Sequence, residues 1–405
     1  MGVLPQAFYP LFLFFLFVAA PLKETSWTTV LWAAPAILAA ALMIAWAAES
    51  AQYFVAQGFA LAILAWLQVL PEFAVEAVLS WHQQTHLLLA NLTGALRLLT
   101  GFGWPAIYFT AAWFHFRRNR QPLNRIVLEE HHSVEIVGLM APLLYIPVIA
   151  IKGSLTVYDG IILILIYAAY LWILAKLPSE DHETIDDLEI IPRTIVKAPR
   201  RKRILAIFGL FAAGGALIYL SAEPFLASLL ALSVLAGVPD FIFVQWIAPL
   251  VSEFPEMLST LYWARRSDRA QMALMNMISS NINQWTLLAA MLPIVYSMSI
   301  GVVTPIAFDP KQRMELWLTL GQAVLALMFL LNMELIWWEA TALAVLFVIP
   351  FFNSAVDPAI TWVYFAWAGV EVARMIIGRR QPKAFPLFIK VWKEHVGGAG
   401  EGNAA

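Results

Sequence analysis

Two proline–glutamate pairs stand inside apolar stretches of the chain, and each is followed by an asparagine in the next apolar stretch. The distance is 20 residues from Pro71-Glu72 to Asn91, counted from the proline, and 21 from Pro255-Glu256 to Asn276. Proline inside a helix frees a backbone carbonyl, and carboxylate, carbonyl and amide oxygens are the ligands of hard cations such as Ca²⁺ and Na⁺. The repeated spacing therefore predicts oxygen-lined cation sites rather than two unrelated kinks.

The composition places these residues in a membrane protein. Of the 405 residues, 61% are hydrophobic and 13% are charged, whereas soluble domains carry about 25% charged residues. Apolar stretches recur from Phe8 to Ile377, which excludes a soluble domain on a single anchor. A net charge of −2 gives no indication of a nucleic-acid partner, and the absence of cysteine excludes disulfides and thiolate metal sites.

Apolar runs long enough to cross a bilayer, which takes about 20 residues, predict an all-α polytopic protein. The candidate spans are 8–22, 28–57, 59–81, 86–115, 133–151, 157–177, 204–236, 240–263, 271–299, 313–331, 335–352 and 357–377. The first is short and lies between Pro10 and Pro21, so it is either a span or an interfacial helix.

The basic residues give the orientation of these spans. Of the 25 Lys and Arg residues, 20 fall in connections on one side of the predicted membrane, and the positive-inside rule makes that side the cytoplasm. Both termini and the loop 178–203 are therefore expected to be cytoplasmic, with the protein in the inner (cytoplasmic) membrane. The loop is acidic in its first half and basic in its second; it is interpreted as a solvated hinge, or alternatively as a regulatory cation-binding loop.

Rare polar residues inside the spans recur in the same order in both halves of the chain. Glu49 corresponds to Glu223 upstream of the two prolines, and Asp159 corresponds to Glu339 near the end of each half. Ionisable residues within spans are costly and usually functional. An odd number of spans in each unit inverts the second copy, and an ion site at the repeat interface is typical of such transporters. The predicted divisions are an N-terminal segment 1–27, a first repeat 28–177, the loop 178–203, a second repeat 204–352, and a C-terminal helix and tail 353–405.

A helix with Pro-Glu followed by a helix with Asn-x-x-Ser-Ser-Asn resembles the α-repeat of the calcium/cation antiporter superfamily, which includes the sodium/calcium exchangers. The match is good in the second half, over 251–256 and 275–281. It is partial in the first half, where Ala95 and Leu96 replace the Ser and the second Asn of the motif. The resemblance covers about residues 30–350.

This resemblance implies a core of two inverted repeats of about five helices, with extra helices at both ends. It also implies antiport of a cation by alternating access, Ca²⁺ or a related ion exchanged for Na⁺ or H⁺. No catalytic residue and no cofactor is expected, and the partners are inorganic cations and the lipid bilayer. The ligands that we expect are Glu72, Asn91, Glu256, Asn276, Ser280 and Asn281, with Glu253, Glu76 and Ser252 as second choices.

Arg97 is a departure from the family pattern. It lies six residues after Asn91, in the middle of a predicted span, where an unpaired guanidinium is costly. We expect it to be paired, with Glu72 or Glu76 on the preceding span as the nearest candidates. The alternative is that its long side chain reaches a membrane interface.

Two other functions compete with transport. His82 and His86 form an H-x-x-x-H pattern, and Glu129 and Glu130 precede His131 and His132. Imidazole and carboxylate suit iron, so a membrane di-iron oxidase is the alternative enzyme, although the predicted topology puts the two groups on opposite sides. A membrane scaffold without transport is the third possibility, because the first repeat is degenerate.

Overall fold

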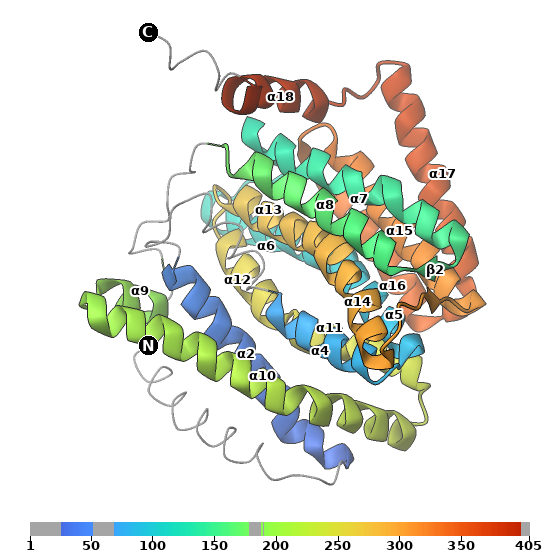
Figure 1. Cartoon of the computed structure of the whole chain (residues 1–405). Coiled ribbons are helices and arrows are strands. Elements are labelled where there is room, and N and C mark those ends of the chain that lie inside the picture. The colour runs from blue at the N-terminus through green and yellow to red at the C-terminus, as the bar shows by residue number, and fades with distance from the viewer. Residues whose placement is uncertain (1–25, 52–68, 178–187, 189, 398–405) are drawn as a thin grey trace. The chain divides into compact units, whose positions relative to one another are not determined.

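The computed structural model is a helical protein whose described residues also form two short β-ribbons (Figure 1). The structure describes residues 26–51, 69–177, 188 and 190–397. The first elements are η1 (Trp27–Thr29), α2 (Val30–Ala51), α4 (Leu70–Trp81), α5 (Thr85–Leu98), η2 (Leu99–Gly103), α6 (Trp104–Asn119), β1 (Arg125–Val127), η3 (Glu130–His132), α7 (Ser133–Lys152), β2 (Ser154–Leu155) and α8 (Val157–Leu174).

The remaining elements begin in the long loop and continue to the C-terminal tail. They are α9 (Ile190–Lys197), α10 (Arg200–Ala236), α11 (Asp240–Ser252), α12 (Phe254–Ala264), α13 (Ala270–Asn283), η4 (Gln284–Leu288), α14 (Ala289–Ile300), β3 (Ile306–Ala307), α15 (Pro310–Leu330), β4 (Glu334–Ile336), α16 (Trp337–Phe352), η5 (Ser354–Val356), α17 (Asp357–Ile376), α18 (Ala384–Val391) and η6 (Trp392–Gly397).

These helices agree with the predicted spans wherever the chain is described. Five are long and apolar enough to cross a membrane unaided, namely those at Trp27–Ala51, Glu130–Lys152, Val157–Leu174, Arg200–Ala236 and Pro310–Leu330, and α11 with α12 makes a sixth if the pair is one broken span. The predicted spans 86–115 and 271–299 correspond to shorter pieces, because α5, η2 and α6 follow one another without a gap, as do α13, η4 and α14. The predicted span 8–22 lies outside the described residues.

Two compact units divide the chain, and each takes segments from both halves of the sequence. Unit 1 comprises 1–91 and 178–255, and unit 2 comprises 92–177 and 256–405. In unit 1, α2 and α10 pack along each other (Figure 1). Gly214 allows this approach, since a Cβ there would lie 2.8 Å from Ile44 Cγ1 and 3.1 Å from the Ala40 carbonyl oxygen. Small residues let membrane helices come this close.

The loop 178–203 contains a helix of unit 1. α9 packs on both α2 and α10, and Pro192, Ile195 and Val196 are buried there. The residues 178–187 and 189, which carry the acidic half of the loop, lie outside the described part of the chain.

Unit 2 shows the inverted relation of the two repeats. β1, before α7, pairs with β4, before α16, and β2, before α8, pairs with β3, before α15. Exchanging the two repeats turns one ribbon into the other. The helix packing follows the same rule, because α8 packs on η4 and α14 whereas α16 packs on η2 and α6.

A π-helical turn interrupts the third helix of each repeat at the same place. η2 begins at Leu99, eight residues after Asn91, and η4 begins at Gln284, eight residues after Asn276. Such turns inside helices are often found at functional sites. Their equal register confirms that the two Asn-containing helices are equivalent elements.

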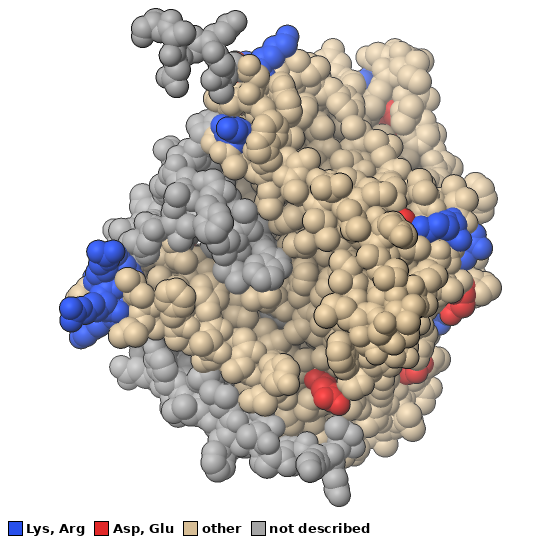
Figure 2. Space-filling model, viewed as in Figure 1, with Lys and Arg blue, Asp and Glu red and all other residues tan. Residues whose placement is uncertain are grey.

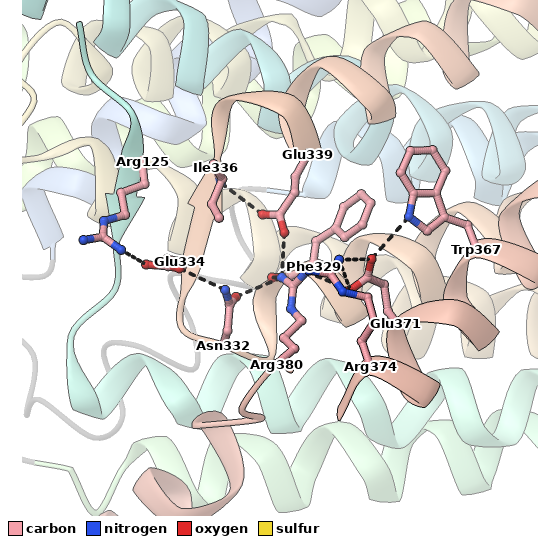
Figure 3. A network of polar contacts seen from close by, with 10 residues as sticks. All are labelled: Arg125, Phe329, Asn332, Glu334, Ile336, Glu339, Trp367, Glu371, Arg374 and Arg380. Carbon is pink, nitrogen blue, oxygen red and sulfur yellow. Dashed lines mark hydrogen bonds and ion pairs between the residues drawn. The ribbon is translucent and has the colours of Figure 1, made fainter. Parts of the chain in front are cut away.

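Helix α17, in the predicted C-terminal extension, is tied into unit 2 by a buried charge network (Figure 3). Arg380, just beyond this helix, donates to Glu339 at 2.6 Å and to Glu371 at 3.0 Å, and all three side chains are at most 5% exposed. Figure 3 shows the guanidinium lying between the start of α16 and the end of α17. The C-terminal segment therefore completes the core of unit 2 rather than extending from it.

Candidate cation-binding site

The two Pro-Glu motifs both open a helix. α4 begins at Leu70 and α12 at Phe254, and each carries its motif glutamate in the first turn. Proline is tolerated there because the first helical N–H groups have no partner within the helix. A carboxylate in the first turn is stabilised by the positive end of the helix dipole.

In unit 2, Glu256 lies against the asparagine helix α13. Its Oε1 accepts a hydrogen bond from Asn276 Nδ2 at 3.3 Å and another from the Ser280 hydroxyl. Asn276 and Ser280 are four residues apart, so they share one face of the helix. The structure thus brings three of the predicted ligands together. Each of them has a side-chain oxygen that can bind a cation: the amide oxygen of Asn276, the hydroxyl of Ser280 and the carboxylate of Glu256.

Asn281 has a different environment from these three. Its Oδ1 accepts from the indole N–H of Trp104 at 3.1 Å and from the Thr100 hydroxyl at 3.4 Å. The side-chain carbonyl oxygen of Asn281, which would ligate a cation, therefore already accepts hydrogen bonds that join α13 to η2 and α6. A ligand role for Asn281 stays a prediction.

In unit 1, the acid that contacts the asparagine is Glu76. Asn91 Nδ2 donates to Glu76 Oε1 at 3.0 Å, and both side chains are buried. Glu72 is buried one turn earlier on the same helix. The sequence ranked Glu72 first because Pro-Glu repeats, but the i, i+4 spacing of Glu72 and Glu76 already placed both on one face.

Two further candidates lie where α11 ends. Glu253 caps the helix and is fully buried. The Ser252 hydroxyl donates back to the carbonyls of Ala248, at 3.2 Å, and Pro249, at 3.4 Å. Because the hydroxyl hydrogen of Ser252 is used within its own helix, the lone pairs of its oxygen are the part of the side chain that could bind a cation.

Arg97 is paired and buried, as the sequence predicts, and its partner is Glu315 on α15. The guanidinium donates at 2.9 Å to Glu315 Oε2, with side-chain exposures of 2% and 5%. Its backbone carbonyl accepts from Gln322 Nε2 at 2.9 Å. This burial rules out the interfacial alternative, and pairing with Glu72 or Glu76 of unit 1 stays a prediction.

Sequence reasoning missed Glu315, although a signal was present. It is the first acidic residue within α15, six residues after the capping residue Asp309. An intramembrane acid calls for a partner, but a sequence separation of 218 residues gives no indication of which cation supplies it.

Three of the histidines of the alternative enzyme each lie near one acidic residue. In unit 1, His82 lies 3.7 Å from Glu223 and His86 lies 3.4 Å from Asp240. In unit 2, His131 lies 3.7 Å from Glu129. Across the described residues no group of three His, Cys, Asp or Glu side chains is arranged to hold a metal ion.

Comparisons with known proteins bear on the family and the fold. The family model described as sodium/calcium exchanger protein matches residues 25–176 and 206–354. The crystal structure of the H⁺/Ca²⁺ exchanger CAX is 31% identical, with a TM-score of 0.86 over 96% of both chains. Native YfkE is 16% identical, with a TM-score of 0.59 over 86% of this chain and 97% of its own.

A third solved structure shares the fold at low identity. The sodium-calcium exchanger NCX_Mj soaked with Na⁺ and Sr²⁺ is 17% identical, with a TM-score of 0.52 over 87% of this chain and 99% of its own. No curated protein matches the chain. The relatives are cation exchangers, so the di-iron enzyme is not supported.

Proposed function

The chain belongs to the sodium/calcium exchanger family, and from that premise we propose that it exchanges Ca²⁺ for H⁺ across a membrane by alternating access. The observation that carries the proposal is Glu256, held by Asn276 and Ser280 on the following helix. A carboxylate flanked by an amide and a hydroxyl is a set of hard oxygen ligands suited to Ca²⁺.

The ligands are assigned separately in each unit. Unit 2 supplies Glu256, Asn276 and Ser280, with Asn281 as a weaker candidate because of its contacts with Trp104 and Thr100. Unit 1 supplies Glu76 and Asn91, with Glu72, Glu253 and Ser252 as further candidates. A divalent cation in a low-dielectric region depends on carboxylate charge, so the acids matter more than the neutral ligands.

Two arguments favour H⁺ over Na⁺ as the counter-ion. The first is that the 31% identical relative is an H⁺/Ca²⁺ exchanger. The second is the first repeat, where Ala95 and Leu96 stand in place of hydroxyl and amide ligands. Na⁺ would have to be ligated by several oxygens, and the first repeat lacks them at these two positions, whereas a proton needs only the carboxylate that Ca²⁺ leaves behind.

We infer that the termini and the loop 178–203 face the cytoplasm, from the distribution of Lys and Arg. Figure 2 shows Lys and Arg side chains gathered at the start of α10, where Arg200, Arg201, Lys202 and Arg203 are consecutive. Tags in this loop and after Lys393 should be cytoplasmic, and a tag at Asp309–Gln312 external. A tag after Lys393 that is accessible from outside would contradict this topology.

The proposed exchange is tested with the purified full-length protein in sealed liposomes. An outward proton gradient without Na⁺ should drive Ca²⁺ uptake, recorded with an internal indicator, and a pH dye should record proton exit. Uptake that requires a Na⁺ gradient would replace H⁺ by Na⁺ as the counter-ion. Absence of flux under every gradient would instead favour the non-transporting scaffold.

A further inference from the structure

Helix α18 and the π-helical turn η6 form one continuous helical segment, 384–397, at an end of unit 2. α18 packs on η3 and on α7, and the Trp392 ring lies 6.0 Å, centroid to centroid, from Trp172 near the end of α8. Figure 1 shows α18 at the end of unit 2 where α7 begins and α8 ends. Since η3 with α7, and α8, are long and apolar enough to cross a bilayer, the segment lies at the level where these two spans reach the membrane surface.

One face of the segment 384–397 packs within unit 2. Ala384 and Val391 are 0% and 4% exposed, and their separation of seven residues puts them on one side of the helix. Phe388 lies between them, with its ring centroid 5.9 Å from that of Trp392. These apolar contacts fix which face of the segment is turned away from the helices of unit 2.

The outward face combines apolar and basic side chains. Ile389 is 53% exposed, and Pro386, Lys390 and Lys393 are exposed at spacings of three and four residues, which places them on the same face. At the surface of a bilayer, such a face can put its apolar side chains among the acyl chains while the lysine ammonium groups reach the phosphates.

Positive charge exceeds negative charge around this face. Three acids lie close by: Glu129 and Glu130 next to η3, and Glu394 within η6. Glu130 already binds Lys390. Five exposed basic residues surround the face, namely Lys176, Arg379, Lys383, Lys390 and Lys393. Within the part of the chain that the structure describes, none of these except Lys390 has a carboxylate partner.

We propose that the segment 384–397 lies in the membrane surface and binds the headgroups of anionic phospholipids, with Ile389 among the acyl chains and Lys383, Lys390 and Lys393 at the phosphates. Basic residues next to a membrane span attract anionic lipid. A zwitterionic headgroup carries a phosphate too, but its ammonium group cancels that charge, so the excess of basic residues selects the anionic lipid. Such binding does not depend on which ions the protein exchanges.

The chain has no cysteine, so Ile389→Cys introduces a unique thiol for an environment-sensitive fluorophore. The labelled full-length protein is placed in liposomes that contain a nitroxide on either phosphatidylglycerol or phosphatidylcholine, close to the headgroup. Both lipids should quench the fluorophore, because residue 389 faces the acyl chains. Phosphatidylglycerol should quench more strongly at the same mole fraction, because it is enriched around the segment.

Charge variants of the labelled protein test the headgroup contact. Lys393→Gln should lower the preference for phosphatidylglycerol by about 5-fold, the contribution of one cation near an anionic membrane surface. Glu394→Gln changes the charge in the opposite direction at the next residue and should raise the preference. Arg118→Gln is the matched control, since it removes one exposed cation of unit 2 from the end of α6, and it should leave the preference unchanged.

Thermal unfolding of the unlabelled proteins gives an independent measurement. Phosphatidylglycerol should raise the melting temperature of the wild type more than phosphatidylcholine does, and Lys393→Gln should lose part of that rise. An unquenched label, equal quenching by the two lipids, or an equal effect of Arg118→Gln and Lys393→Gln would overturn the proposed site. Loss of the lipid preference in millimolar inorganic phosphate would assign the basic face to a soluble anion and would overturn it as well.

Discussion

The third helices of the two repeats have the same backbone and different chemistry. In α13, the residues four, five and six positions after the asparagine are Ser280, Asn281 and Ile282, and in α5 they are Ala95, Leu96 and Arg97. The π-helical turn nevertheless begins eight residues after the asparagine in both. The backbone break is thus independent of the side chains that surround it.

This difference separates the features of the repeat that form the fold from the side chains that form the ion site. The second repeat keeps oxygen ligands around Glu256, whereas the first holds a fixed cation against Glu315. A buried ion pair contributes little net stability, because desolvation offsets the Coulomb attraction. We therefore interpret Arg97 as the cation that neutralises Glu315, so that Glu315 takes no part in ion binding.

The largest effect is expected from Glu256→Gln. Glutamine keeps the shape and the hydrogen bonds to Asn276 and Ser280, but the negative charge is lost. Loss of one partner from a buried charge pair costs about 2–5 kcal/mol, which corresponds to roughly 30-fold or more in apparent Ca²⁺ affinity. Ca²⁺ flux at limiting concentration measures it, and equal expression and melting temperature show that the fold persists. Wild-type flux would remove Glu256 from the site.

Arg97→Gln should affect stability more than ion affinity. It leaves Glu315 buried without its cation, which costs about 3–5 kcal/mol, so the melting temperature in detergent should fall. The double variant Arg97→Ile with Glu315→Leu gives the first repeat the side chain of the second and should recover most of the loss. A single variant as stable as wild type would contradict the interpretation of the pair.

One pair of equivalent acids sharpens the comparison. Asp159 and Glu339 both open the last helix of a repeat, and each carboxylate accepts from the backbone N–H three residues earlier. Asp159 is bound by Lys152, whose side chain is 37% exposed, whereas Glu339 is bound by Arg380, which is 5% exposed.

Arg380→Gln should therefore destabilise the protein by about 3–5 kcal/mol. Lys152→Gln should cost only about 0–1 kcal/mol, because solvent screens the exposed pair. Thermal unfolding of both variants measures the difference. Equal losses would mean that the C-terminal network of Figure 3 is not part of the core.

The sequence predicts most of the fold because bilayer length and hydrophobicity set it. Apolar runs such as 133–151 and 157–177 became α7 and α8 within three residues at each end. The inverted relation followed from matching Pro-Glu and Asn positions, which depends only on order along the chain. The divisions at 27, 177, 203 and 352 stay predictions, since the compact units combine segments from both halves.

The remaining features depend on packing in the folded protein, which the spacing of residues along the chain does not determine. The run Leu99–Gly103 carries no signal for a π-helical turn, and nothing local selects Glu76 over Glu72 as the partner of Asn91. Glu315 pairs with Arg97 across 218 residues. In the last two cases the determining contact joins different helices, so helix-level reasoning finds the candidates without choosing among them.

The smallest expected effect on ion affinity, and the most direct comparison of the repeats, comes from exchanging one hydroxyl. Ser280→Ala removes a hydrogen bond to Glu256 worth about 0.5–1.5 kcal/mol, so apparent Ca²⁺ affinity should fall roughly 2–10-fold. Ala95→Ser places a hydroxyl at the equivalent position of the first repeat, four residues after Asn91. If the second repeat alone supplies a hydroxyl ligand, Ala95→Ser should leave affinity unchanged, because the new hydroxyl can bond its own helix carbonyl. An affinity gain as large as the Ser280→Ala loss would show that the first repeat still faces the ion, and Arg97 would then have to be interpreted as a counter-charge within the site.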